Sequence, residues 1–312
     1  MEFGAHLPQM TWGDDGPVPL SVLTDFARTA NELGFTWLSA NDHVVYARPW
    51  LDGPVALASA LPHSGGMTVA TTIGLPVIRG PGPYAKTLAA LDRFSDGRLV
   101  VGVGPGSSER DYRAMGIPWE ERWPRFEEVV QALRALLRPA GEPFRGIFYS
   151  TEGMELLPGP AQPDGPPIWI GSWGSDAGLR RVARLADGWL ASAYNTTPDA
   201  FADARRRLGE HLTPAGIDPE RFPNTIATMF MYVTEDRAAA DDVLSDMLAP
   251  ALRREADELR ERLLVGPAGA CADMLARYAA AGADRILVWP VRDVVRQLER
   301  FHDTVLVKLD AN

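Results

Sequence analysis

An acidic residue and a histidine stand side by side at Asp42-His43, directly after a short run with the pattern of a β-strand. A histidine exchanges a proton near neutral pH and can polarise an oxygen atom, so the pair is suited to acid–base chemistry. The alternative is structural: Asp42 would cap backbone N–H groups while His43 packs beside it. Because both residues fall where a strand should end, we favour the functional interpretation, with His43 as the catalytic group.

A second candidate is the glycine spacing Gly102-Val103-Gly104-Pro105-Gly106, which also lies at the end of a predicted strand. Glycine there has two explanations: a tight turn that needs a positive φ, or a backbone that comes close to a ligand. The dinucleotide-binding motif G-x-G-x-x-G is absent, because position 107 is serine. Both explanations stay open from the residues alone.

The segment Gly171-Ser172-Trp173-Gly174-Ser175 joins a predicted strand to a predicted helix. A helix N-terminus presents free N–H groups and the positive end of the helix dipole, which suit a phosphate group. The alternative is an ordinary turn capped by Ser175, whose side-chain oxygen would accept a hydrogen bond from a helix-start N–H. No lysine-bearing P-loop motif occurs here, so we do not expect a P-loop nucleotidase.

Other reactive residue types give weaker signals. His6 ends the first predicted strand, but a single histidine there is more often structural than functional. Only His6, Asp42 and His43 stand at strand ends with metal-ligand chemistry, so we expect no metal site. Cys271, the one cysteine, has apolar helical spacing around it and is expected to be a packing residue.

The elements that must position these residues alternate along the chain. Apolar and β-branched runs predict eight strands, at 2–7, 35–40, 67–78, 98–103, 167–171, 188–193, 225–233 and 285–289. Amphipathic patterns predict helices at 18–34, 84–94, 118–137, 175–186, 198–212, 237–264, 269–281 and 294–306. Residues 141–160 interrupt this rhythm and are expected to form a short hairpin insertion.

This alternation predicts a single (β/α)₈ TIM barrel, with loop insertions at the C-terminal face of the strands and one domain over residues 1–312. The alternative is an open doubly wound sheet, because periodicity does not show whether a sheet closes. In a barrel the carboxyl ends of the strands form the active-site face, so Asp42-His43 and both glycine segments would meet there.

Composition narrows the class of protein. The chain has 31 Lys and Arg against 41 Asp and Glu, a net charge of −10, which argues against a nucleic-acid partner. A single cysteine excludes an internal disulfide. The N-terminus lacks the pattern of a secretion signal, and no apolar run is long enough to span a membrane. We therefore expect a cytoplasmic enzyme that acts on a small molecule without membrane or nucleic-acid partners.

Several segments together resemble the bacterial luciferase-like flavin and deazaflavin oxidoreductases, which are (β/α)₈ barrels that use FMN or coenzyme F420. The resemblance covers nearly the whole chain and is carried by residues 31–43, 72–78, 85–122, 166–189 and 282–290. The most specific block is SDGRL before the glycine-rich strand end, followed by Tyr112, Gly116 and Arg122.

The resemblance implies roles for the matching positions. Asp42 would touch the flavin-type ring or its side chain, and His43 would face the substrate and handle a proton. Pro76-Val77 would form the non-prolyl cis peptide that backs the ring. The ring edge and ribityl chain would contact Gly104, Pro105, Gly106 and Arg110. The cofactor phosphate would lie at Gly171, Ser172, Trp173 and Gly174, although Trp173 replaces the small residue usual there.

The resemblance also bears on cofactor and substrate. F420-dependent sugar-phosphate dehydrogenases of this family carry a catalytic glutamate where this chain has Ser107, with Glu109 two residues on, so we do not expect a sugar-phosphate substrate. The composition and the N-D-H and glycine loops are more similar to the F420 branch than to the FMN branch.

We therefore expect an F420-dependent oxidoreductase that transfers a hydride between the deazaflavin C5 and a small organic substrate. One alternative is an FMN-dependent monooxygenase that uses O2 and a separate flavin reductase. A second is a barrel that binds a flavin or deazaflavin without catalysis. The resemblance further implies a homodimer.

Overall fold

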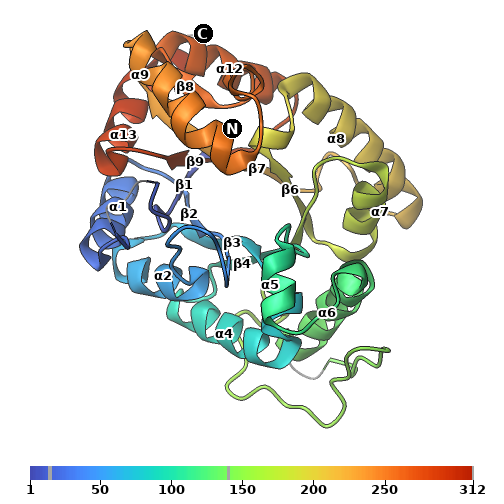
Figure 1. Ribbon diagram of the computed structural model, residues 1–312. Helices are drawn as coiled ribbons and strands as arrows, with labels where there is room; N and C mark the ends of the chain where they lie inside the picture. The colour runs from blue at the N-terminus through green and yellow to red at the C-terminus, as the bar shows by residue number, and fades with distance from the viewer. Residues whose placement is uncertain (13–15, 139–140, 311–312) are drawn as a thin grey trace.

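A closed barrel of parallel strands forms the centre of the molecule in a computed structural model that describes residues 1–12, 16–138 and 141–310 (Figure 1). The barrel strands are β1 (Glu2–His6), β2 (Trp37–Ala40), β3 (Thr68–Gly74), β4 (Leu99–Val103), β5 (Ile168–Gly171), β6 (Gly188–Ser192), β7 (Asn224–Val233) and β9 (Arg285–Pro290). Each strand pairs in parallel with its neighbours, and β9 closes the ring by pairing with both β7 and β1. The predicted TIM barrel is confirmed, and the open doubly wound sheet is excluded.

Helices surround the barrel and cover its outer face (Figure 1). Their bounds are α1 (Leu20–Glu32), α2 (Gly53–Ala60), α3 (Pro76–Arg79), α4 (Pro81–Phe94), α5 (Glu109–Ala114), α6 (Arg122–Leu137), α7 (Asp176–Leu185), α8 (Pro198–Leu212), α9 (Arg237–Asp242), α10 (Ala249–Leu252), α11 (Ala256–Arg260), α12 (Ala268–Ala280), α13 (Val294–Arg300) and α14 (Val307–Asp310). Their apolar stripes pack on the strands, as Leu179 and Val182 of α7 do. Across the described ranges, none of the helices is long and apolar enough to cross a membrane.

Three elements differ from the expectations. The third strand ends at Gly74, and the helix α3 follows, because Pro76 cannot donate to a strand ladder but suits the first turn of a helix. The helical pattern over 237–264 includes the first residue of a ninth strand, β8 (Leu264–Gly266), which pairs with Met231–Val233 at the C-terminal end of β7. Residues 141–160 form a projecting loop in which the expected hairpin is limited to one antiparallel bridge, Arg145 to Ser150 (Figure 1).

The lower half of the barrel interior, at the N-terminal ends of the strands, is filled by large apolar side chains. Trp37 of β2 and Trp169 of β5 have ring centroids 5.5 Å apart, and Leu287 packs in the same cluster. Glycines make the room: a Cβ on Gly4 would lie 2.6 Å from the Trp37 Cβ, and one on Gly188 would lie 2.5 Å from Trp169 Cε2. This half is a packed plug, as in other barrels of this kind.

Candidate active site

The upper half of the barrel interior carries a buried polar cluster. His6, at the end of β1, has its Nδ1 2.9 Å from Ser39 Oγ of β2 and 3.3 Å from Thr72 Oγ1 of β3. Burial lowers the pKa of His6 to about 3, although the Asn41 side chain opposes this shift. His6 is therefore uncharged at neutral pH and acts as a hydrogen-bonding group. Its role is structural, although it lies at the mouth of the barrel.

His43 is held at the mouth by a carboxylate that is distant in sequence. Its Nδ1 lies 3.2 Å from Asp111 Oδ2, while the Val45 backbone N–H donates to Asp111 Oδ1 at 2.6 Å. Burial would raise the pKa of Asp111, but these hydrogen bonds and the nearby imidazole lower it below its usual value. Asp111 is thus ionised, and it fixes the orientation of the imidazole so that Nε2 is the nitrogen left for other partners.

Asp111 lies on the short helix α5, which follows the glycine loop of β4. Ser108 caps this helix by accepting a hydrogen bond from the Asp111 N–H at 3.4 Å. Asp111 was not among the predicted site residues, because nothing in the spacing links it to a histidine 68 positions earlier. The one available signal was an acidic residue just beyond a strand-end loop.

Asp42 is buried and ion-paired. Arg79, at the end of α3, donates from Nε to Asp42 Oδ2 at 2.6 Å and from Nη2 to Asp42 Oδ1 at 2.8 Å. The same guanidinium also contacts Asp52, which caps α2. Burial alone would lower the pKa of Arg79, but the two carboxylates raise it above its ordinary value. Arg79 was not among the predicted site residues, yet it fixes Asp42 beside His43, and the contact predicted between Asp42 and a cofactor stays a prediction.

The glycines of β4 and its loop serve two purposes. Gly106 has a φ of 85°, which favours glycine. A Cβ on Gly104 would lie 2.2 Å from Ile73 Cδ1, so this glycine makes room for a side chain of β3. Pro105 accepts a hydrogen bond from the Tyr112 hydroxyl, while Arg110 is exposed on α5. Their predicted contacts with a ring and ribityl chain stay predictions.

The predicted position of the non-prolyl cis peptide is wrong. The bond is at Thr72–Ile73, within β3, and Pro76-Val77 lies in the first turn of α3. The prediction failed because Pro76-Val77 is in a helical turn, where proline fits the first position. Both residues are buried beside the end of β3, and their contact with a cofactor stays a prediction.

The segment before α7 has features of an anion site. Ser175 caps the helix, as predicted, by accepting a hydrogen bond from the Gly178 N–H at 3.2 Å. Ser172 is fixed by the Trp189 indole, which donates to its carbonyl oxygen at 3.0 Å. Arg207 of α8 donates to the Gly174 carbonyl at 2.8 Å and pairs with Asp203, so an arginine side chain reaches this segment.

The remaining residues of that segment are accessible. Trp173 is 58% exposed, and Gly174 has a φ of 87°, which favours glycine. Gly171 lies beside the end of β3, because a Cβ added to this glycine would be 3.2 Å from Ile73 Cγ2. The segment therefore lies at the mouth, and the choice between a phosphate site and a capped turn stays open.

Buried polar atoms without hydrogen-bond partners gather at the mouth. Within the described residues they include His6 Nε2, Gln9 Oε1, Asn41 Oδ1, Trp50 Nε1 and Trp289 Nε1. Such atoms cost free energy unless a ligand or water pairs with them. Of these atoms, His6 Nε2, Gln9 Oε1 and Asn41 Oδ1 suit the polar edge of a flavin-type ring, so the residues present fit such a cofactor.

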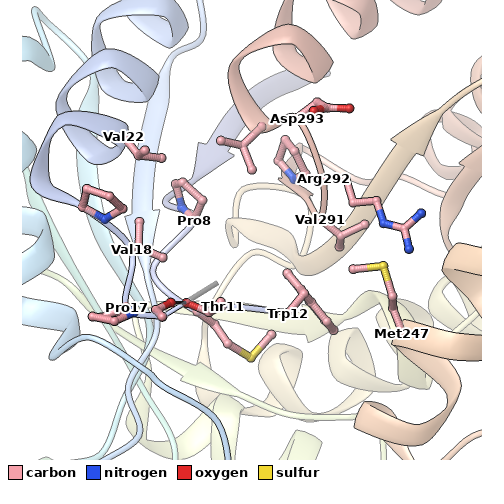
Figure 2. Close-up of a pocket in the computed structure, with 15 residues that line it drawn as sticks. Pro8, Thr11, Trp12, Pro17, Val18, Val22, Met247, Val291, Arg292 and Asp293 are labelled. Carbon is pink, nitrogen blue, oxygen red and sulfur yellow. Dashed lines mark hydrogen bonds between the residues drawn. The ribbon is translucent and has the colours of Figure 1, made fainter. Parts of the chain in front are cut away.

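A cleft of about 570 Å³ opens beside the mouth (Figure 2). It lies between the segment after β1 and the segment after β9, and its labelled lining includes Trp12, Val18, Met247 and Val291. Cys271 lies elsewhere, buried in α12, where burial raises the pKa of its thiol to about 12. No cluster of three or more His, Cys, Asp or Glu suited to a metal occurs in the part of the chain that the structure describes.

Comparisons with known proteins agree with this arrangement. An F420-dependent glucose-6-phosphate dehydrogenase of Nakamurella multipartita is 33% identical over 195 residues, covering 59% of this chain and 55% of the relative. An FMNH2-dependent dimethylsulfone monooxygenase of Pseudomonas putida is 31% identical over 198 residues, which cover 59% of this chain and 51% of the relative. The chain thus spans about half the length of the curated relatives it matches.

A solved F420-dependent secondary alcohol dehydrogenase shares the fold, with a TM-score of 0.83, 18% identity and 98% of each chain covered. The names of these relatives describe oxidoreductases, which supports the expected enzyme class. The sequence model of the luciferase-like monooxygenases matches residues 1–258, well over half of the chain. The chain belongs to the luciferase-like monooxygenase family.

Proposed function

We propose that this chain is an F420-dependent oxidoreductase that transfers a hydride between the deazaflavin C5 and a small organic substrate. The observation that carries the proposal is the His43–Asp111 pair at the mouth of a barrel of this family, beside buried polar atoms without partners. Relatives named for F420 and for FMN both match the chain, so the choice of F420 rests on the residues of the loops.

The chain's own residues would handle the proton. Asp111 is ionised and holds His43 Nδ1, so Nε2 is directed toward other partners and can give a proton to, or take one from, a substrate oxygen. Asp42, held by Arg79, fixes the backbone on which His43 stands. Coenzyme F420, when bound, would supply two-electron hydride chemistry, whereas FMN would also permit chemistry with dioxygen.

The cofactor would be held by residues from four strand ends, those of β2, β3, β4 and β5. The ring would lie near Asp42 and the buried Pro76-Val77 turn, and the ribityl chain near Gly104, Pro105, Gly106 and Arg110. The phosphate would lie at Gly171, Ser172, Trp173 and Gly174, where the N-terminus of α7 offers backbone N–H groups. A homodimer and a cytoplasmic location are part of the same proposal.

The alternative within the same family is an FMN-dependent monooxygenase, which would need a separate flavin reductase as a partner. It is favoured by the relative named as an FMNH2-dependent monooxygenase. A barrel that binds the cofactor without catalysis is a further alternative, and it would bind F420 tightly while showing no reaction over a broad substrate panel.

Titration of the purified protein with F420 and, separately, with FMN tests the proposal. Cofactor fluorescence and the thermal midpoint are the two measurements, since a ligand that binds the folded state raises that midpoint. Micromolar binding of F420 with a weak FMN response supports the proposal. Tight FMN binding with no F420 response contradicts it and favours the monooxygenase.

A further inference from the structure

Six aromatic side chains form a continuous wall that starts at His43. The members of this aromatic wall are Trp12, Tyr46, Trp50, Tyr194, Phe230 and Trp289. The His43 ring centroid lies 4.6 Å from that of Trp50, which lies 5.9 Å from Trp289. The wall unites segments that follow β1, β2 and β6 with residues of β7 and β9, so it is a feature of the folded mouth rather than of one loop.

The aromatic wall has a packed side and an accessible side. Phe230 and Trp289 are buried, with ring centroids 4.7 Å apart, whereas the other four members are half-buried. The ring centroids of Trp12 and Phe230 are 5.4 Å apart, and Trp12 also lines the cleft shown in Figure 2. Apolar surface therefore runs from His43 to the cleft, and aromatic surface of this kind binds flat apolar groups.

Two hydrogen-bond donors in the aromatic wall are unpartnered. The indole Nε1 atoms of Trp50 and Trp289 are buried and have no acceptor among the residues that the structure describes. An indole N–H can only donate, so its complement is an oxygen acceptor on a bound molecule or water. A carbonyl or hydroxyl oxygen satisfies such a donor without bringing charge into the mouth.

The charges around His43 disfavour an anion. The carboxylates of Asp42 and Asp52 share the guanidinium of Arg79, and the carboxylate of Asp111 pairs with the His43 imidazole. An anionic substrate at His43 would therefore meet like charge in a partly buried site, which costs free energy.

The other arginines that contact the aromatic wall are engaged in hydrogen bonds. Arg48 donates to the Trp12 carbonyl, Arg254 donates to Asn195 Oδ1 and Arg262 donates to the Tyr194 carbonyl. Arg292 also lines the cleft beside Trp12. A phosphorylated substrate is therefore disfavoured by the carboxylates around His43 rather than by a lack of arginine.

We infer that the substrate is an uncharged, ring-bearing alcohol or carbonyl compound whose apolar body lies against the aromatic wall. Its oxygen would be placed within reach of His43 Nε2 and an indole N–H. The inference rests on the proposed function, because that activity makes this surface a substrate site. It separates the chain from its relative named as a glucose-6-phosphate dehydrogenase, whose substrate carries a phosphate.

Binding measurements with two probes test the inference. Acetophenone and glucose 6-phosphate are titrated separately into the protein, alone and loaded with F420, and followed by ligand-detected NMR and calorimetry. Trp50→Ala removes the ring, Trp50→Phe keeps a ring but removes the N–H, and Trp123→Phe, on α6 away from the mouth, is the matched control. Thermal midpoints show that each variant is folded.

We expect acetophenone to bind, with its affinity weakened about tenfold by Trp50→Ala and about threefold by Trp50→Phe, and unchanged by Trp123→Phe. Glucose 6-phosphate should not bind. Binding of glucose 6-phosphate, or acetophenone affinity that Trp50→Ala leaves unchanged, overturns the inference. F420 affinity is measured on the same samples: F420 binding without acetophenone binding refutes the substrate class alone, whereas acetophenone binding without F420 binding refutes the proposed function.

Discussion

The two halves of the barrel interior are built from the same strands and filled in opposite ways. The lower half holds Trp37, Trp169 and Leu287, which pack against one another where glycines and alanines make room for them. The upper half holds His6, Ser39 and Thr72, which are smaller and joined by hydrogen bonds. Burial is similar in both halves, so the difference lies in chemistry rather than in solvent access.

This difference separates stability from function within one barrel. Dispersion and the hydrophobic effect dominate in the lower plug, where the Arg285 guanidinium also lies over the rings of Trp37 and Trp169. In the upper half, buried polar atoms such as His6 Nε2 and Trp289 Nε1 are without partners in the described residues, which costs stability unless a ligand pairs with them. Substitutions in the two halves should therefore affect different measurements.

The largest expected effect is on turnover, from His43→Ala at the mouth. Removing a positioned proton-transfer group should lower kcat by about 10²–10⁴-fold, while the Kd for the cofactor changes by less than about threefold. Steady-state kinetics and cofactor titration on the same preparation check this. Asp111→Asn is the companion variant: it keeps the imidazole but removes the charge that orients it, and should lower kcat less. Equal losses in turnover and cofactor binding would contradict the role of His43.

Trp169→Ala tests the lower plug. Truncating this buried indole should lower the free energy of unfolding by about 3–5 kcal/mol, because the cavity left among Trp37 and its neighbours cannot close. Denaturant unfolding measures the loss. At a temperature where the variant stays folded, its Kd for the cofactor should equal that of the parent chain. A selective loss of cofactor binding would show that the two halves are not separate.

Arg79→Met tests the ion pairs behind the mouth. Methionine leaves the buried Asp42 and its neighbour Asp52 without their cation, so stability should fall by about 3 kcal/mol at neutral pH. Adding Asp42→Asn to Arg79→Met should restore part of the loss. A double variant as unstable as the sum of both single variants would show that Asp42 and Arg79 do not interact.

Local pattern was enough to predict most of the fold. The eight barrel strands lie close to the predicted ranges because each buried strand is a short apolar run between turn residues. The strand β8 was missed because its three residues, Leu264–Gly266, continue the apolar pattern of the preceding helices. Its pairing with β7 is a tertiary contact that periodicity does not encode.

The candidate site could be predicted only in part. His43 and Asp42 were found because strand-end position is visible in the sequence, whereas their partners Asp111 and Arg79 were not, because those pairs form through folding. The cis peptide was misplaced by four residues, from Thr72–Ile73 to Pro76-Val77, because backbone conformation within an apolar run leaves no local signature.

His6→Gln tests the upper half through pH. The pKa of His6 is lowered from 6.5 to about 3 in the folded chain. Between these pH values His6 is therefore protonated in the unfolded chain but not in the folded chain. Stability from this group is fully present above pH 6.5 and falls as the pH is lowered toward 3. The loss should be about 1 kcal/mol at pH 5.5. The free energy of unfolding of His6→Gln should therefore fall less than that of the parent chain as the pH is lowered from 6.5. An equal fall in both proteins would contradict the lowered pKa of His6.

The smallest expected effect is that of Ser39→Ala, which removes one hydroxyl from the upper cluster. His6 Nδ1 would keep Thr72 as its other partner, so the cost should be about 1 kcal/mol in the free energy of unfolding. Ser59→Ala, in α2, is the matched control, since its half-buried hydroxyl bonds only to the Ala56 carbonyl of its own helix. In the His6→Gln background, Ser39→Ala should cost less, because the two residues share one hydrogen bond. Additive losses in the double variant would mean that Ser39 acts independently of His6, and the upper half would then be a set of separate polar side chains rather than a cluster.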